Sequence, residues 1–517
     1  MTDFLIGLDF GTASARGVLV SVETGKEVAS HVVDYPHGTL TKTLPDGTPL
    51  GRSWALQVAG DYLEAAETIL SKLGNGRKVA GIGLGFTASS PMPTDATGTP
   101  LSDLHPDDPH AYVKLWKHGA AQKQADRINQ QGGAYLDRFG GKVSAEWLLA
   151  KAAQIAEESP ESWSRTARFI EAGDWIVWQL VGSEHRSLGF AAYKAQYDGA
   201  DGYPNNVVDG LADRLSDPHP VGTAAGVLNQ SWRDKTGIIG PCAVAVAVID
   251  SHVVLPAIGA VTDGCFVAAL GTSAVSMILS KEEYPLPKGI EGAAFDGSIR
   301  GLWCYEAGQA SFGDTLNWFV QMAPRGKDNA ESFAAYNAEA KALKPGESRL
   351  LAIDWWNGNR VPHADSGLSG MILGLTLQTD AVAIYRSLVE GLCYGMRQIF
   401  DLYIDGGFTV SRVVMSSGLA QRNPFLVQVM ADVIGRPIEV PDIDNTTAIG
   451  AAIHGAVASQ VVAGFKEGAA QFGARSAKTF KPDPAAHALY SELFSAYLRL
   501  SKNEDVKRAI QILNSPI

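Results

Sequence analysis

Runs of apolar residues recur along the chain, and several of them end at a short polar tip. The first run lies at Leu5–Val20, where apolar positions flank the polar segment Asp9-Phe10-Gly11-Thr12. Residues such as Ile6 and Val18 favour extended strands, and Gly11 permits backbone geometry that a side chain resists. The pattern predicts a β-hairpin whose tip presents a carboxylate, backbone N–H groups and a hydroxyl.

The same pattern returns about 260 residues later, which is close to the spacing expected of two large domains. Phe266–Leu279 again consists of two apolar runs, joined here by Gly271-Thr272-Ser273. Carboxylates bind Mg²⁺, and clustered N–H and hydroxyl donors suit phosphate oxygens. We therefore expect the two hairpins to hold a magnesium nucleotide from both sides of an interdomain cleft.

A third run, Ala243–Ile249, is the longest continuous apolar stretch of strand-like residues and predicts a buried parallel strand. It ends abruptly at Asp250. Catalytic groups concentrate where the strands of α/β folds end, so Asp250 is a candidate for the chemistry. Its position alone fits a residue that caps a following helix equally well.

The remaining pattern alternates strands and helices, which is typical of an α/β fold. We expect further strands at Val28–Val33 and Val79–Phe86, and helices at Trp54–Leu73, Ala111–Arg127, Ala145–Ala156, Ile170–Val181, Ala381–Tyr403, Pro424–Ile434 and from Ala448 onward. The glycines of Val79–Phe86 lack the third member of a dinucleotide-binding fingerprint, which excludes that interpretation. The polar loop Thr87–Pro91 follows a strand end, where ligands usually bind.

Composition narrows the class of protein. Of the 517 residues, 46% are apolar and 19% are charged, and 43 basic against 55 acidic side chains give a net charge of −12. Without a dense basic run, nucleic acid and anionic membranes are excluded as main partners. We expect no membrane span, no signal peptide and a cytoplasmic location.

Neither cysteines nor histidines predict a metal site. The four cysteines are scattered and fit buried, reduced thiols: Cys242, Cys265, Cys304 and Cys393. Three histidines lie close together in sequence at His105, His110 and His118, but Pro106 and Pro109 break the helical spacing that a shared metal would need.

In chain order, the motifs resemble those of the FGGY carbohydrate kinases, which belong to the superfamily of sugar kinases, heat-shock chaperones and actin. The segments that carry the resemblance are Asp9-Phe10-Gly11-Thr12, Ile249-Asp250-Ser251-His252, Leu270-Gly271-Thr272-Ser273, Ser417 to Pro424 and Ala448-Ile449-Gly450-Ala451-Ala452. The resemblance implies two ribonuclease-H-like α/β domains of the actin-like ATPase type. Residues 1–256 would bind the sugar and carry the catalytic base, and residues 257–517 would bind ATP.

The resemblance also implies a set of site residues. Asp250 would be the catalytic base, and Asp9 with Asp250 would hold Mg²⁺. The sugar would contact Ala88, Ser89, Lys194, Asp250 and Glu306. ATP would contact Gly11, Thr12, Ser14, Arg16, Gly271, Thr272, Ser273, Gly313, Gly418, Leu419 and Asn423.

Within the family the chain is most similar to the L-ribulokinases, through Gly81 to Ser89, Val113 to His118, Glu306 to Gln309 and Trp355 to Gly358. This likeness implies ATP-dependent phosphorylation of a ketopentose, L-ribulose first, at its primary hydroxyl. The chain departs from that pattern at Gly85, at Ala192-Tyr193 and at Ser416-Ser417.

Two alternatives remain. One is a xylulokinase or another ketose or polyol kinase, although the loop after Phe86 lacks the Gln-Met-His triplet of xylulokinases. The other is an actin-like or chaperone-like ATPase, which is disfavoured because little chain follows Gly450 to build a peptide-binding domain. The sequence leaves a homodimer open.

Overall fold

The computed structural model describes residues 3–514, and the chain folds into two compact units. Unit 1 consists of Met1–Val261, Ala293–Cys304 and Ile443–Ala474, and unit 2 of Thr262–Gly292, Tyr305–Asp442 and Arg475–Ile517. The first boundary lies five residues beyond the expected one at 256/257. Unlike the contiguous halves expected from the sequence, both units are assembled from separate stretches of chain.

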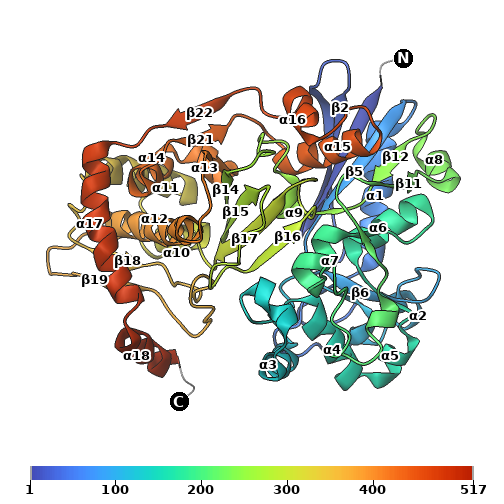
Figure 1. The fold of residues 1–517 in the computed structure, drawn as a ribbon, viewed down its shortest axis with the longest axis horizontal. Helices are drawn as coiled ribbons and strands as arrows, with labels where there is room; N and C mark the ends of the chain where they lie inside the picture. Colours follow the sequence, from blue (N-terminus) through green and yellow to red (C-terminus); the bar gives the residue numbers. More distant parts are fainter. Residues whose placement is uncertain (1–2, 515–517) are drawn as a thin grey trace. The chain divides into compact units, whose positions relative to one another are not determined.

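Unit 1 is built on a mixed sheet of order β11-β12-β5-β1-β2-β3, with β13 also paired to β5 (Figure 1). Its strands are β1 (Phe4–Phe10), β2 (Ser14–Ser21), β3 (Glu27–Asp34), β5 (Val79–Phe86), β11 (Ala224–Val227), β12 (Ala243–Ala245) and β13 (Val248–Ile249). The predicted opening hairpin is confirmed, because β1 and β2 pair antiparallel from Phe4↔Ser21 to Phe10↔Ala15. β1 and β5 run parallel, so their carboxyl ends meet at one edge.

The predicted strand Ala243–Ile249 is buried, but it is not continuous. Val244 pairs with Ile82, whereas Val248 pairs with Gly85, so one extra residue is accommodated between the two pairings. Such a bulge bends a strand and redirects the residues that follow it. The sequence expectation of a single strand was therefore wrong: the strand breaks at residues 246–247, and only the two-residue β13 separates the break from Asp250.

Helix α15 (Thr446–Ala458) lies against β1 and β5, and it brings a late stretch of sequence into unit 1 (Figure 1). Glycines make this close approach possible. A Cβ built on Gly7 would lie 1.8 Å from the Ala448 carbonyl oxygen, and one on Gly83 would lie 1.9 Å from the Ala451 carbonyl oxygen. The glycines of β5 are therefore explained by helix packing, in agreement with the exclusion of a dinucleotide fingerprint.

The other helices of unit 1 differ in part from the pattern-based expectation. The helix expected at Trp54–Leu73 begins only at Ala59, after a short strand. The helix expected at Ala111–Arg127 is wrong over its first part, because a 3-10 turn and a two-residue strand precede α3. The elements are β4 (Leu56–Gln57), α1 (Ala59–Gly74), β6 (Pro91–Thr94), α2 (Leu101–Leu104), η1 (Pro109–Ala111), β7 (Val113–Lys114) and α3 (Gln122–Gln131).

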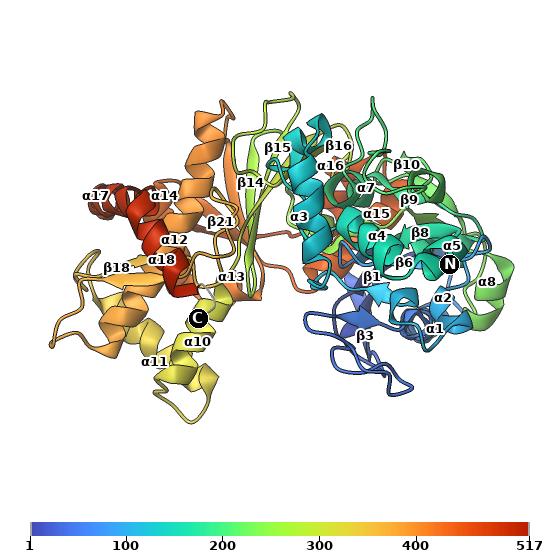
Figure 2. The ribbon, with the colours of Figure 1, turned by 90° about the horizontal axis from the view of Figure 1, so that it is seen from below.

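A second group of helices in unit 1 surrounds its own apolar cluster, which includes Ile128, Leu149, Ile155 and Phe169. Figure 2 shows α3, α4, α5 and α7 in this region, and α4 contacts each of the other three. The remaining elements of unit 1 are η2 (Ala134–Phe139), α4 (Leu148–Glu158), α5 (Pro160–Arg165), β8 (Arg168–Glu171), α6 (Ala172–Val181), β9 (Arg186–Ser187), α7 (Leu188–Ala195), η3 (Ala212–Arg214), β10 (Pro218–His219), α8 (Gln230–Thr236), α9 (Asp250–Val253) and α16 (Phe465–Phe472).

Unit 2 contains a second mixed sheet, in which β17-β15-β14-β20-β21-β22 are neighbours. The short strand β16 (Gly292–Phe295) falls almost entirely in the stretch Ala293–Cys304 of unit 1. The second predicted hairpin is confirmed as β14 (Cys265–Leu270) and β15 (Ala274–Ser280). The other strands are β17 (Trp303–Gln309), β18 (Leu351–Ile353), β19 (Met371–Leu373), β20 (Arg412–Ser416), β21 (Ile438–Pro441) and β22 (Ala477–Phe480). The helices are α10 (Gly313–Met322), α11 (Asn329–Ala342), α12 (Ala381–Asp405), α13 (Gly418–Arg422), α14 (Pro424–Ile434), α17 (Pro484–Ser501) and α18 (Glu504–Asn514).

Two further expectations concern the cysteines and membrane-spanning helices. All four cysteines are buried and none forms a disulfide within the described residues, as the sequence predicted. Over residues 3–514, no helix combines the length and the apolar character required to cross a membrane.

Candidate active site

In unit 1, the candidate residues gather where β1, β5 and β13 end. Asp9 pairs with Gly85 across the parallel strands β1 and β5, and Phe86 pairs with Ile249, the residue before Asp250. Three neighbouring strands therefore deliver Asp9, the loop after Phe86 and Asp250 to one edge of the sheet. This is the edge at which open α/β sheets bind ligands.

The tip of the first hairpin is held by hydrogen bonds from outside the hairpin. Gly11 N–H donates to the Ser14 carbonyl oxygen at 3.0 Å, which closes the turn. Gln57 Nε2 donates to the Thr12 carbonyl oxygen at 2.7 Å, and Trp116 Nε1 donates to Thr12 Oγ1 at 3.0 Å. Because Thr12 Oγ1 accepts from Trp116, its own proton can be donated to a phosphate oxygen.

Arg16, a predicted ATP contact on β2, is exposed and lies beside the start of α15. Its Nη1 donates to Asn445 Oδ1 at 2.7 Å, and Asn445 Nδ2 donates to the two carboxylate oxygens of Glu27 at 3.0 and 3.1 Å. The guanidinium is thereby oriented by the residue that precedes α15. Its positive charge also lowers the pKa of Asp9.

The pKa of Asp9 is strongly raised by its surroundings. Burial, and then the negative charge of Asp250, raise the pKa of Asp9 from 3.8 to about 7, against the lowering effect of Arg16. Two carboxylates that destabilise each other in this way fit a divalent cation, which would relieve their repulsion. In residues 3–514 no group of three or more His, Cys, Asp and Glu side chains is placed to hold a metal. Mg²⁺ typically takes only one or two protein carboxylates and completes its shell with water and phosphate.

This pKa predicts how Asp9→Asn changes stability with pH. Between pH 3.8 and about 7 the folded state holds a proton on Asp9 that the unfolded state releases, so wild-type stability falls as the pH rises through this window. Asn cannot titrate. We expect the free energy of unfolding of Asp9→Asn, relative to wild type, to increase from about pH 4 to about pH 8 in urea titrations with EDTA. Parallel curves would contradict the assignment, and the exposed Asp213→Asn serves as the matched control.

Asp250 opens the four-residue helix α9, and its Oδ1 accepts the Ser251 N–H at 2.7 Å. The residue at the N-cap of α9 is Ile249, which makes no side-chain cap hydrogen bond, so the capping interpretation of Asp250 was wrong. His252, two residues further, is fully buried. Its Nδ1 lies 2.7 Å from Ser298 Oγ, and its ring packs edge-on against Tyr193.

The predicted sugar contacts of unit 1 lie on the β5 loop and on α7. Ala88 is half-buried, Ser89 is buried with a left-handed φ of 64°, and Lys194 Nζ lies 5.9 Å from the centre of the Trp147 ring. Gly85 leaves no room for a side chain, because a Cβ there would lie 2.9 Å from Val253 Cγ1. The fifth predicted contact, Glu306, belongs to unit 2, where it lies on β17 with 8% of its surface exposed.

In unit 2, three of the predicted nucleotide segments come together. The hairpin turn closes through Gly271 N–H and the Ser273 carbonyl oxygen at 2.8 Å, and Gly313 N–H donates to the Gly271 carbonyl oxygen at 3.0 Å. A Cβ on Gly313 would lie 2.6 Å from that oxygen and 3.6 Å from a methyl group of Leu419. The hairpin, the start of α10 and the start of α13 therefore converge. Thr272 and Gly418 lie beside them in sequence.

Asn423, a predicted ATP contact, is held by two hydrogen bonds within unit 2. It is 4% exposed, its Oδ1 accepts the Leu426 N–H at 3.1 Å as the cap of α14, and its Nδ2 donates to Asn337 Oδ1 at 3.3 Å. Both ends of the amide are used within the fold. Each of these bonds uses one of the two Nδ2 protons or one of the two Oδ1 lone pairs, so the nucleotide contact stays a prediction.

Sequence reasoning missed the residues that support the site. Gln57 and Asn445 hold Thr12 and Arg16, and they lie 45 and 429 residues away from them in the chain. Lys151 and Glu171 are buried charges next to the β5 loop. A weak signal existed for Lys151, because it interrupts the apolar run Leu148 to Ala153.

The histidines behave as structural residues. His118 Nδ1 accepts the Ala55 N–H at 3.2 Å, and its Nε2 donates to Gln154 Oε1 at 2.9 Å. Burial lowers the pKa of His110 to about 3 and that of His118 to about 2, with the Lys114 charge adding to the effect. Both rings are therefore neutral near pH 7.

Comparison with known proteins places the chain in a family. Residues 266–459 match the profile of the FGGY family of carbohydrate kinases, C-terminal domain. A ribulokinase of Geobacillus thermodenitrificans is 39% identical, with 96% of this chain and 94% of the relative aligned. A ribulokinase of Halalkalibacterium halodurans is 40% identical, with the same coverage. The fold is shared with a xylulose kinase of Rhodospirillum rubrum, at a TM-score of 0.83 and 21% identity over 96% of this chain and 98% of that one.

The fold and these likenesses define a carbohydrate kinase with the actin-like ATPase fold. The chain belongs to the FGGY family of carbohydrate kinases.

Proposed function

We propose that the protein transfers the γ-phosphoryl group of ATP to the primary hydroxyl of a ketopentose, with L-ribulose as the first candidate. The observation that carries this proposal is the placement of Asp250 beside Asp9 and the β5 loop at one edge of the sheet in unit 1. The full-length likeness to ribulokinases at 39 and 40% identity supports the choice of sugar.

Asp250 is the proposed general base. In phosphoryl transfer most of the catalysis is positioning and charge stabilisation, and the base has only to accept the proton of the attacking hydroxyl. The redirected end of β13 presents the Asp250 carboxylate at the strand edge, while the Ser251 N–H holds one of its oxygens. The second oxygen would receive the proton.

The two Gly-Thr tips are the proposed phosphate contacts. Thr12 Oγ1 and Thr272 Oγ1, together with the backbone N–H groups beside them, would donate to oxygens on which charge develops in the transition state. Asp9 and Asp250 would hold Mg²⁺, which neutralises phosphate charge when it is bound. The arrangement of Asp9 fits this role because its carboxylate is destabilised by burial and by a second negative charge.

The sugar is assigned to Ala88, Ser89 and Lys194 in unit 1 and to Glu306 in unit 2. An ammonium and a carboxylate are suited to the hydroxyl groups of a sugar, because ionised groups make strong hydrogen bonds. The departures from the usual ribulokinase pattern at Ala192-Tyr193 lie inside the fold, where the Tyr193 hydroxyl donates to the Cys304 carbonyl oxygen.

The test is a coupled ADP-release assay with L-ribulose, D-ribulose, xylulose, ribitol and glycerol, each with ATP and Mg²⁺. We expect kcat/KM for L-ribulose to exceed that for every other acceptor by about tenfold or more. Highest turnover with xylulose or a polyol would replace L-ribulose by that acceptor. ATP hydrolysis that no sugar stimulates would favour the actin-like or chaperone-like ATPase and overturn the proposal.

A further inference from the structure

The loop that follows β5 is held in a strained conformation by two buried charges, Lys151 on α4 and Glu171 at the end of β8. Ser89 in this loop has φ 64°, a left-handed conformation that is unfavourable for a residue with a side chain. Such conformations persist only where surrounding contacts enforce them, and they cluster at ligand sites.

Lys151 binds one side of the loop. Its Nζ donates to the carbonyl oxygens of Ser89 at 2.7 Å, Leu115 at 2.9 Å and Lys114 at 3.3 Å. An ammonium group has three protons, so these three carbonyl groups use all of them. Lys151 therefore connects the loop to residues 114–115. The next residue, Trp116, donates a hydrogen bond to Thr12 in the turn between β1 and β2.

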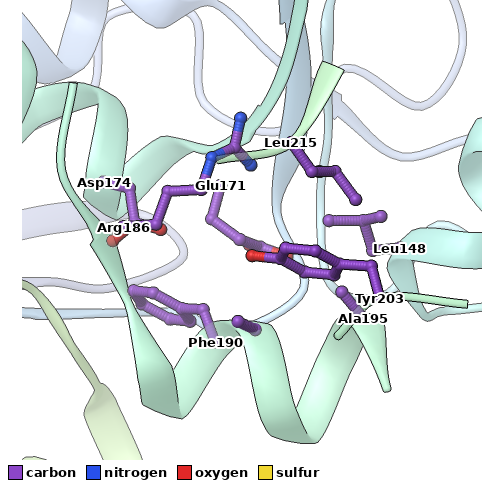
Figure 3. A pocket seen from close by; sticks show the side chains of 9 residues that line it. Leu148, Glu171, Asp174, Arg186, Phe190, Ala195, Tyr203 and Leu215 are labelled. Atoms are coloured by element: carbon purple, nitrogen blue, oxygen red, sulfur yellow. The ribbon is translucent and has the colours of Figure 1, made fainter. Parts of the chain in front are cut away.

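Glu171 binds the other side of the same loop. Its Oε2 accepts the Ser90 N–H at 2.7 Å, so the carbonyl and the N–H of the Ser89–Ser90 link are held by opposite charges. Figure 3 shows Glu171 at a small cavity that is also lined by Asp174, Arg186 and Tyr203. Its second oxygen, Oε1, is buried and has no hydrogen-bond partner among the described residues.

Burying these two charges destabilises the fold, because both ions lose their hydration. Lys151 is 0% and Glu171 3% exposed, and an apolar pair of similar volume could fill such space without the desolvation cost of two ions. Burial lowers the pKa of Lys151 and raises that of Glu171, and the attraction between the two groups opposes both shifts. Stability alone therefore does not explain why the charges are present, whereas fixing a strained loop does.

We propose that Lys151 and Glu171 are positioning residues that hold the Thr87–Ser90 loop in the geometry that receives the sugar. The inference rests on the proposed function, because Ala88 and Ser89 are sugar contacts only if the protein is a sugar kinase. Neither side chain needs to touch the substrate. Each acts through a peptide group of the loop.

The experiment compares Lys151→Met, Glu171→Leu and the double variant with wild type, using L-ribulose and ATP. We expect each single variant to raise KM for L-ribulose about tenfold or more, with KM for ATP changed less than about threefold. Glu171→Gln keeps an acceptor oxygen for the Ser90 N–H, so its KM for L-ribulose should stay within about threefold of wild type. The exposed Lys123→Met is the matched control.

Thermal melting separates positioning from simple stabilisation. Each single variant leaves one buried charge without its counterpart, so we expect Tm to fall in both and to recover in the double variant. KM for L-ribulose should remain high in the double variant because both anchors of the loop are lost. If a single variant fails to fold, the double variant and Glu171→Gln carry the test.

The outcomes also separate this inference from the proposed function. A wild-type protein that phosphorylates none of the sugars overturns the proposed function and, with it, the role of the loop. An active wild type whose double variant keeps the wild-type KM for L-ribulose overturns the positioning role alone. The positioning role is also overturned if KM for ATP rises in the double variant as much as KM for L-ribulose.

Discussion

Asp250→Asn is expected to lower kcat for sugar phosphorylation by about 10³-fold, because a general base contributes about 10²–10⁴-fold and Asn cannot accept the proton. Asn has the same shape, and its oxygen can still accept the Ser251 N–H that Asp250 Oδ1 accepts at 2.7 Å. The first turn of α9 should therefore survive. The measurement is the steady-state rate of ADP release with saturating L-ribulose, ATP and Mg²⁺.

Two further readouts separate lost chemistry from lost structure. ATP should still bind to Asp250→Asn in calorimetry, because the nucleotide contacts proposed in unit 2 are unchanged. The pKa of Asp9 should fall, since the Asp250 charge is one of the causes that raise it. Turnover within about tenfold of wild type would remove Asp250 from the catalytic role. The exposed Asp213→Asn should behave as wild type.

Gly83→Ala is expected to destabilise unit 1 by about 3 kcal/mol or more, beyond the usual range for an added methylene. The new Cβ would lie 1.9 Å from the Ala451 carbonyl oxygen and 2.9 Å from the Gly455 backbone nitrogen. Both atoms belong to the backbone of α15, so no side chain can rotate away. The helix would have to move off β5 to admit a single methyl group.

The measurement is a urea titration followed by circular dichroism, with the midpoint compared between variants. Gly60→Ala is the control, because Gly60 lies on the exposed side of α1 and a Cβ there would meet only Val58 at 3.9 Å. Alanine favours helix over glycine by about 1 kcal/mol at most, so the control should be neutral or slightly stabilised. A Gly83→Ala midpoint equal to wild type would contradict the packing described for α15.

Much of the local structure could be predicted from the sequence, because periodicity reports which backbone geometry buries the apolar side chains. The two Gly-Thr hairpins, β5 and α14 follow from their patterns with little change. Prediction failed where tertiary contacts outweighed a local pattern. The stretch at Ala111–Arg127 has the pattern of an amphipathic helix, but Val113–Lys114 pairs with Leu56–Gln57 as a strand instead.

The candidate site divides in the same way. Asp9, Asp250 and the two hairpin tips could be found from the sequence, because each is a polar group at or directly after the end of an apolar strand. The residues that hold them in place could not be found in this way. Asn445 reaches Arg16 across 429 residues, and the contact exists only because α15 returns to the first sheet.

By itself, the sequence determined the α/β class, the hairpins and the polar residues at the ends of the strands, because strand and helix periodicity and side-chain type are local properties. Only the tertiary structure decided that α15 packs on β1 and β5, that one extra residue redirects Asp250, and that Lys151 and Glu171 hold the Ser89–Ser90 link. These features depend on close approach between segments far apart in the chain. No local pattern encodes such distances, because they arise only when the apolar faces pack together.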